Sequence, residues 1–183
     1  LRIGIDKENP YPQALSLFGS LDGVEVVRGD DPLLELAFSR GPEELLFYTS
    51  GVTVYTHRGR GATSGEQTAA GAVDKARAFL ERHGGLDGLT LSRVVPYRRE
   101  GTYLVEFGQS YGRFPLVGAS GAVLVVAPGG VENCWRRRLT VFGESGRPRT
   151  VVSAADALLA LALERPRPEA APLTVHEVVL GYY

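Results

Sequence analysis

A chain of 183 residues is long enough to bury a sizeable hydrophobic core, in one large domain or two small ones. Hydrophobic residues make up 44% of it and charged residues 22%, as in ordinary soluble globular proteins. The 20 basic and 21 acidic residues nearly balance, which argues against a general binder of nucleic acid or of membrane surfaces, since both need a basic excess.

The ends of the chain and its cysteine content say little about its compartment. No run of the sequence approaches the roughly 18 apolar residues of a transmembrane helix, and no signal-peptide pattern is present. Because the chain begins with Leu1 and contains no Met, we expect it to be a soluble piece of a longer protein. The single cysteine, Cys134, cannot form an internal disulfide, so cysteine usage leaves the compartment open.

The first third of the chain is predicted to contain short strands and one short helix. Residues 1–5 alternate like a strand, Asn9 followed by Pro10 predicts a helix start, and Gly19 predicts its end. The residues expected on the inward face of this helix are Tyr11, Ala14, Leu15 and Phe18. Strands are then predicted over 24–28, 33–39, 44–49 and 52–57, separated by turns rich in Gly and Pro.

A longer helix is predicted next, over 64–83. Ser64 and Gln67 form a capping-box pattern, and apolar residues recur at helical spacing as far as Leu80. His83 falls in the last turn, and Gly84 ends the helix.

The rest of the chain repeats this mixture of strands and a helix. Strands are predicted over 89–98, 102–109, 112–117, 122–127 and 131–142. The strand over 122–127 is apolar throughout, so it should be central in its sheet or covered on both faces. A second helix, capped by Ser153, is predicted over 153–164 and expected to be deeply buried, because it has almost no polar face. A final strand is predicted over 173–183.

Runs of strands followed by a helix predict an α+β fold, with antiparallel sheets each packed by a helix. We divide the chain into a first half, 1–100, with its helix near 64–83 and its strand 89–98, and a second half, 101–183, with its helix near 153–164 and its strand 173–183. Residues 89–95 resemble residues 173–179, and the order of elements is alike. An internal duplication is therefore the favoured interpretation, and chance similarity between β-rich segments is the alternative.

The residues that usually carry chemistry do not form a recognisable set, so neither catalysis nor a cofactor or metal is predicted. The glycines of residues 59–65 depart from the spacing of a dinucleotide-binding loop. His57, His83 and His176 are isolated, whereas a zinc site needs converging ligands. Cys134, beside Trp135, is expected to be a small core residue.

A local basic patch is the candidate interaction surface. Arg136, Arg137 and Arg138 are consecutive, with Arg147 and Arg149 close behind, and on a strand Arg136 and Arg138 share one face. The patch either meets an acidic partner or anionic headgroups, or protects a sheet edge by its charge. Tyr111, Phe114 and Trp135 supply candidate aromatic contacts, with core packing favoured for Phe114 and Trp135. The candidate interaction residues are Tyr111, Arg136 and Arg138. We expect the side chains of the two arginines to face solvent.

An ordered series of short motifs over residues 89–183 resembles the YycI/YycH group of extracytoplasmic regulatory proteins. The closing segment, ending in Leu180-Gly181-Tyr182-Tyr183, is similar to the last strand of that family. The other motifs are residues 103–107, residues 109–112, Pro115, Gly121, residues 129–131 and residues 153–158. The first half of the chain is less similar to the family.

The resemblance implies PepSY-like α+β units, a single N-terminal membrane anchor in the parent protein and an extracytoplasmic location. It implies a non-catalytic role in cell-wall regulation, by association with a sensor histidine kinase of the WalK type or with a sibling regulatory protein. It carries over no catalytic, cofactor or metal residues and no nucleic-acid partner. The alternative function is a PepSY-like protease inhibitor or ligand-binding domain of the cell envelope.

Overall fold

The computed structural model describes residues 2–5, 9–29, 32–59, 65–111, 114–116 and 121–143. The helices are α1 (Pro10–Phe18) and α2 (Ala69–His83). The strands are β1 (Arg2–Ile5), β2 (Glu25–Val27), β3 (Leu34–Arg40), β4 (Glu43–Tyr48), β5 (Val52–His57), β6 (Leu89–Tyr97), β7 (Arg99–Tyr111), β8 (Phe114–Pro115), β9 (Gly121–Ala127), β10 (Gly130–Arg137) and β11 (Leu139–Gly143). The predicted helix 153–164 and strand 173–183 lie outside the described residues.

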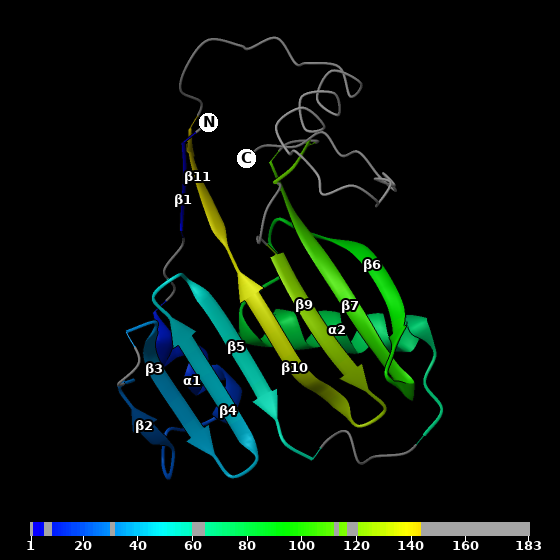
Figure 1. The fold of residues 1–183 in the computed structure, drawn as a ribbon, viewed down its shortest axis with the longest axis horizontal. Helices are drawn as coiled ribbons and strands as arrows, with labels where there is room; N and C mark the ends of the chain where they lie inside the picture. The colour runs from blue at the N-terminus through cyan, green and yellow to red at the C-terminus, as the bar shows by residue number, and fades with distance from the viewer. Residues whose placement is uncertain are drawn as a thin grey trace, which may run out of the picture.

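Most of these strands form one antiparallel sheet in the order β2-β3-β4-β5-β10-β9-β7-β6, and β8 pairs with the end of β7. This confirms the α+β class and corrects the expectation of separate sheets, each with its own helix. The two groups of strands join because β5 pairs with β10, from Val52 against Arg137 to Thr56 against Asn133. Beyond this sheet, β1 pairs with β11 in a two-stranded extension that projects away from it (Figure 1).

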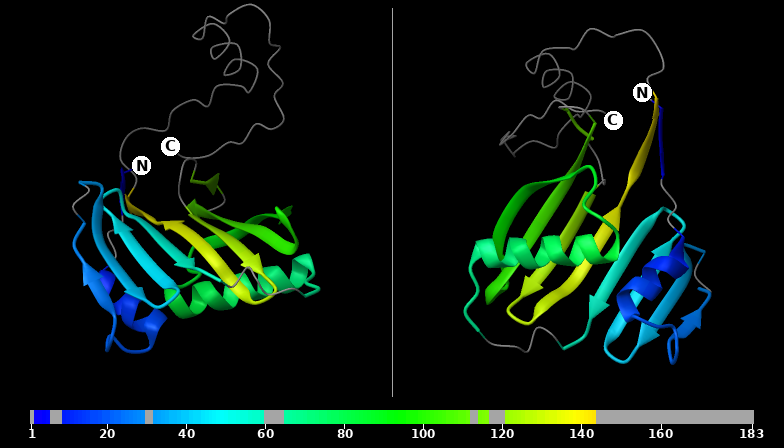
Figure 2. Two further views of the ribbon diagram at one scale, coloured as in Figure 1. Left: turned by 60° about the horizontal axis from the view of Figure 1, so that its bottom comes forward. Right: turned by 180° about the vertical axis from the view of Figure 1, so that it is seen from behind.

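Both helices pack against the same face of the sheet, as the two views of Figure 2 show. We call this the helix face and the opposite one the open face, since none of the described helices lies on it. The core fills the space between the helices and the sheet, where Phe38, Leu80, Leu124, Val105 and Val126 are the largest fully buried side chains. The strand β9 is central, as predicted from its apolar sequence, and lies between β10 and β7.

The ends of α1 follow from local sequence. The side chain of Asn9 accepts a hydrogen bond from the backbone N–H of Tyr11 at 3.2 Å, which caps the first turn. Gly19 ends the helix with φ at 74°, a conformation that favours glycine. The prediction that Tyr11 and Leu15 face inward is wrong, since their side chains are 52% and 49% exposed. The sheet covers only the narrower arc of α1 that carries Ala14 and Phe18.

The start of α2 differs from the predicted capping box at Ser64 and Gln67. The helix begins at Ala69, and the side chain of Thr68 caps it by accepting from the N–H of Gly71 at 3.1 Å. Gln67 instead donates from its amide nitrogen to two sheet carbonyls, those of Gly101 and Val126, each at 3.1 Å. This glutamine therefore fixes the segment that leads into α2 against β7 and β9.

The order of elements is matched on the two sides of the β5–β10 pairing. Along the chain, α1 is followed by β2, β3, β4 and β5, and α2 is followed by β6, β7, β9 and β10, with the two-residue β8 between β7 and β9. Across the sheet, the second group runs in reverse order, so that the last strand of each group lies at the centre. The predicted strand 89–98 corresponds to β6, which pairs with β7 at the outer edge.

Candidate interaction surface

Two arginines of the predicted basic patch, Arg136 and Arg138, lie on the helix face, whereas Arg147 and Arg149 lie outside the described residues. Arg136 is only 6% exposed, and its guanidinium donates to the carbonyl oxygen of Gly84 at 2.6 Å and of His83 at 3.4 Å. Arg138 is half-buried and donates to the carbonyls of Gly84 and Asp87, both at 3.4 Å. Both side chains therefore bind the end of α2 and the turn that follows it.

The expectation that Arg136 faces solvent is therefore wrong, whereas Arg138 remains partly exposed. The last carbonyls of a helix have no partner within the helix, and a nearby cation satisfies them and opposes the helix dipole. Gly84 permits this close approach, because a Cβ at that position would lie 1.3 Å from a guanidinium nitrogen of Arg136. Tyr111, the third predicted interaction residue, ends β7, and its side chain is not among those described.

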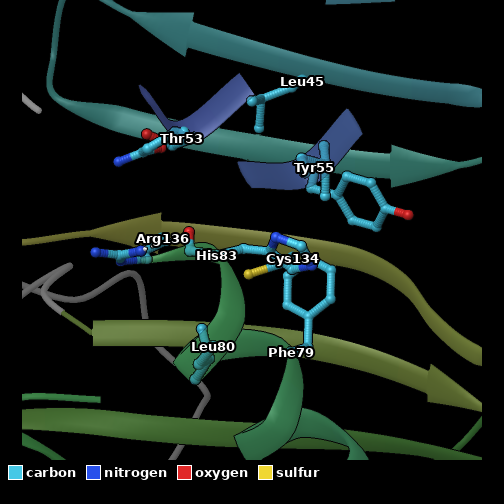
Figure 3. A pocket seen from close by; sticks show the side chains of 10 residues that line it. Leu45, Thr53, Tyr55, Phe79, Leu80, His83, Cys134 and Arg136 are labelled. Carbon is cyan, nitrogen blue, oxygen red and sulfur yellow. Dashed lines mark hydrogen bonds between the residues drawn. The ribbon is translucent and has the colours of Figure 1, made fainter. Parts of the chain in front are cut away.

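A small gap of about 30 Å³ lies between β5, β10 and the two helices (Figure 3). The side chains of Tyr55, Phe79, His83 and Cys134 surround it, and the rings of Phe79 and His83 are 4.7 Å apart. Burial raises the pKa of the Cys134 thiol from 9.0 to about 12, and the charge of Arg136 opposes that rise. The thiol is therefore protonated at neutral pH, which confirms the prediction of a core cysteine and disfavours nucleophilic use.

Apolar side chains form a continuous row across the open face. Paired residues on neighbouring strands share a face, and this row is defined by successive pairs from β2 to β9. It consists of Val27, Ala37, Leu46, Val54, Trp135 and Val123. Each of the six is at least partly exposed, with Val27 at 47% and Trp135 at 40%. We call these six residues the apolar row.

A basin of about 480 Å³ adjoins Trp135 at one end of the open face. Its rim includes Arg98, which has φ of 52° and stacks over the ring of Tyr97 at 5.0 Å. Arg99 donates to both carboxylate oxygens of Glu132, each at 2.6 Å, which fixes the opposite side of the basin. The surface beside the apolar row is thus concave and lined by an aromatic ring and an ordered ion pair.

Sequence reasoning assigned Trp135 to the core, and the structure corrects this. Alternation along β10 places Trp135 opposite in direction to Cys134 and Arg136. The pattern Cys-Trp-Arg shows that the tryptophan and its neighbours lie on different faces, but not which face the helices cover. Because buried arginines are rare, sequence reasoning placed Arg136 outside, whereas the helix carbonyls hold it inside.

No family model, curated protein or solved structure matches the chain. Among the described residues, no three His, Cys, Asp or Glu side chains gather as a metal site would require. None of the helices in that part of the chain has the length and hydropathy needed to span a membrane. The fold and the surface therefore carry the functional proposal.

Proposed function

We propose that this chain is a non-catalytic regulatory module that binds another protein through the open face of its sheet. The observation that carries the proposal is the apolar row, which crosses six strands on a face that no described helix covers. Apolar patches of this extent on a soluble domain mark contact surfaces, and a half-exposed tryptophan is a common anchor in them.

The partner in this proposal is the extracytoplasmic part of a membrane sensor histidine kinase of the WalK type, or a sibling regulatory protein. The resemblance of residues 89–183 to the YycI/YycH group supports this choice. The same resemblance supports an extracytoplasmic location and a single N-terminal membrane anchor in the parent protein, with a role in cell-wall regulation.

Internal duplication of a PepSY-like unit belongs to the same proposal, with the repeats redrawn as residues 10–57 and 69–137 in place of the halves 1–100 and 101–183 predicted from the sequence, whose second helix lies outside the described residues. Its support is the matched order of a helix followed by four strands, with the two last strands adjacent. Superposing residues 10–57 on residues 69–137 tests it. The proposal expects the two helices to cross their strands in the same sense, and opposite senses would end it.

The proposed contact is tested by co-purifying the anchored full-length parent with its kinase. Trp135→Glu places a charge within the apolar row, so we expect recovery of the kinase to fall about tenfold or more. Leu15→Glu is the matched control, because Leu15 is 49% exposed on α1, on the other side of the sheet. That control should retain the kinase at the wild-type level.

A parent protein that keeps its anchor but lacks this domain completes the experiment. Loss of the kinase from it, together with loss through Trp135→Glu, supports contact through the open face. Full retention by the protein without the domain would refute the proposed function. Thermal melting of both point variants shows whether they fold, and Val54→Lys gives an independent disruption of the same row.

A second candidate function is favoured by a separate feature of the helix face. A cleft of about 430 Å³ lies between α1 and α2, within the range of sites that bind small molecules. It supports the alternative of a PepSY-like ligand-binding domain or protease inhibitor of the cell envelope. The cleft and the open face lie on opposite sides of the sheet, so the two functions are separable.

A further inference from the structure

The cleft between the helices has an apolar body. Leu17 and Phe18 of α1 form one wall, and Ala78 and Phe79 of α2 form the other. The ring of Tyr55, from β5, lies at its base, 5.0 Å from the ring of Phe79. The two rings are tilted by 41° to each other and give the cleft an aromatic lining.

The base of the cleft is closed, so a ligand would lie on top of the rings. The gap beneath them, beside Cys134, has room for about one water molecule only. The hydroxyl of Tyr55 donates to the Glu43 carboxylate at 3.0 Å, which holds the ring in place. The surface that a ligand would meet is therefore already formed.

Two cations lie on the same wall of the cleft. Lys75 and Arg82 of α2 are seven residues apart, so they share one side of the helix with Ala78 and Phe79 between them. The ammonium of Lys75 donates to the carbonyl of Pro128 at 2.7 Å and to the side chain of Gln67. The backbone around Arg82 is fixed across the cleft, because the hydroxyl of Ser16 in α1 donates to its carbonyl.

The charges around the cleft favour an anion. Among the described residues that line the cleft, the two cations face one carboxylate, that of Glu43, which already accepts the hydrogen bond from Tyr55. Arg82 is exposed at the mouth, where its guanidinium can pair with a carboxylate or sulfonate in two parallel hydrogen bonds. An apolar body beside a cation is the arrangement that recognises an amphipathic anion.

We propose that this cleft binds a small amphipathic organic anion, with its apolar body between Leu17 and Phe79 and its acidic group on Arg82. The site is independent of the proposed partner contact, because the apolar row lies on the opposite face of the sheet.

Titration with 1-anilinonaphthalene-8-sulfonate, an aromatic anion, tests the proposal through the rise in its fluorescence. Arg82→Glu should weaken binding about tenfold or more, because it replaces the pairing cation by a like charge. Arg77→Glu makes the same change of charge on an exposed position of α2 outside the cleft lining, and should bind as the wild type does. Ala78→Phe, which fills the cleft without changing its charge, should also abolish binding.

Competition against the bound probe establishes the class of ligand. Octanoate should displace it, whereas octylamine, with the same chain and the opposite charge, should not. The proposal is overturned if the wild type gives no fluorescence rise, if Arg82→Glu and Arg77→Glu bind alike, or if octylamine competes as well as octanoate. Thermal melting of each variant separates loss of the site from loss of the fold, and Arg82→Gln replaces Arg82→Glu if the latter unfolds.

Discussion

At the scale of single residues, Cys134 shows how surroundings decide what a side chain does. It lies on the helix face of β10, 4% exposed, opposite Tyr55 on β5. A thiolate there would lose its hydration and gain only the partial compensation of the Arg136 charge. The thiol consequently behaves as a small apolar group that packs the joint between the two groups of strands.

This burial predicts a loss of stability at alkaline pH. The folded-state pKa of Cys134, about 12, lies above its unfolded value of 9.0, so the folded state binds the proton more tightly. The stabilisation is complete below pH 9 and is lost as the pH rises toward 12; at pH 10.5 about 2 kcal/mol is gone. Urea unfolding between pH 8 and 10.5 measures it.

Comparison with Cys134→Ala isolates the contribution of the thiol, because the two proteins differ in no other titratable group. Between pH 8 and 10.5, the free energy of unfolding of the variant should fall by about 2 kcal/mol less than that of the wild type. Parallel profiles for the two proteins would show that the thiol is not held protonated by burial.

At the scale of elements, the end of α2 depends on one glycine and one arginine together. Gly84 has φ of 156° and leaves the space that the guanidinium of Arg136 occupies. Arg136 in turn satisfies carbonyls that the helix leaves without a partner. The two residues come from distant parts of the chain, so this contact also holds α2 against β10.

A double-mutant cycle tests this dependence. Gly84→Ala should destabilise the protein by about 2–4 kcal/mol, because the added methyl group displaces the Arg136 guanidinium from its buried hydrogen bonds. With Arg136→Ala already present, the cost should fall by at least about 1 kcal/mol, since the obstacle is gone. Urea unfolding of the wild type, the two single variants and the double variant measures the cost of Gly84→Ala in each background.

Gly85→Ala is the control for this cycle. Gly85 also has a positive φ, 77°, but a Cβ there meets nothing within 4 Å. Gly85→Ala should lower the free energy of unfolding by about 1–2 kcal/mol through backbone strain. This loss should be the same whether residue 136 is Arg or Ala. An equal cost of Gly84→Ala in both backgrounds would contradict the proposed contact.

The features that sequence reasoning predicted correctly depend on neighbours along the chain. Asn9 before Pro10 and Gly84 after His83 mark helix ends through local hydrogen bonding and backbone freedom, so their effect is visible in the sequence. The locations of Trp135 and Arg136 depend on which face of the sheet the helices cover, which local sequence does not determine. The prediction that Arg136 faces solvent failed for this reason.

At the scale of the whole molecule, the pairing of β5 with β10 turns two groups of four strands into one sheet with one open face. This pairing joins residues about 80 positions apart, and nothing in the alternation of either strand specifies its neighbour. It also makes the apolar row continuous, because Val54 of the first group lies beside Trp135 of the second. The proposed contact surface is thus a product of the assembled sheet.

The contact surface is tested most directly by ¹⁹F NMR of the chain labelled with 5-fluorotryptophan. Trp135 is the single tryptophan of the chain, so one resonance reports on the apolar row, and an unlabelled partner stays silent. When the extracytoplasmic part of the WalK-type kinase is added, we predict that this resonance shifts and loses its sensitivity to exchange of H₂O for D₂O, as Trp135 is covered. A resonance that keeps its position and its solvent sensitivity, while size-exclusion chromatography shows that the complex has formed, would contradict binding through the open face.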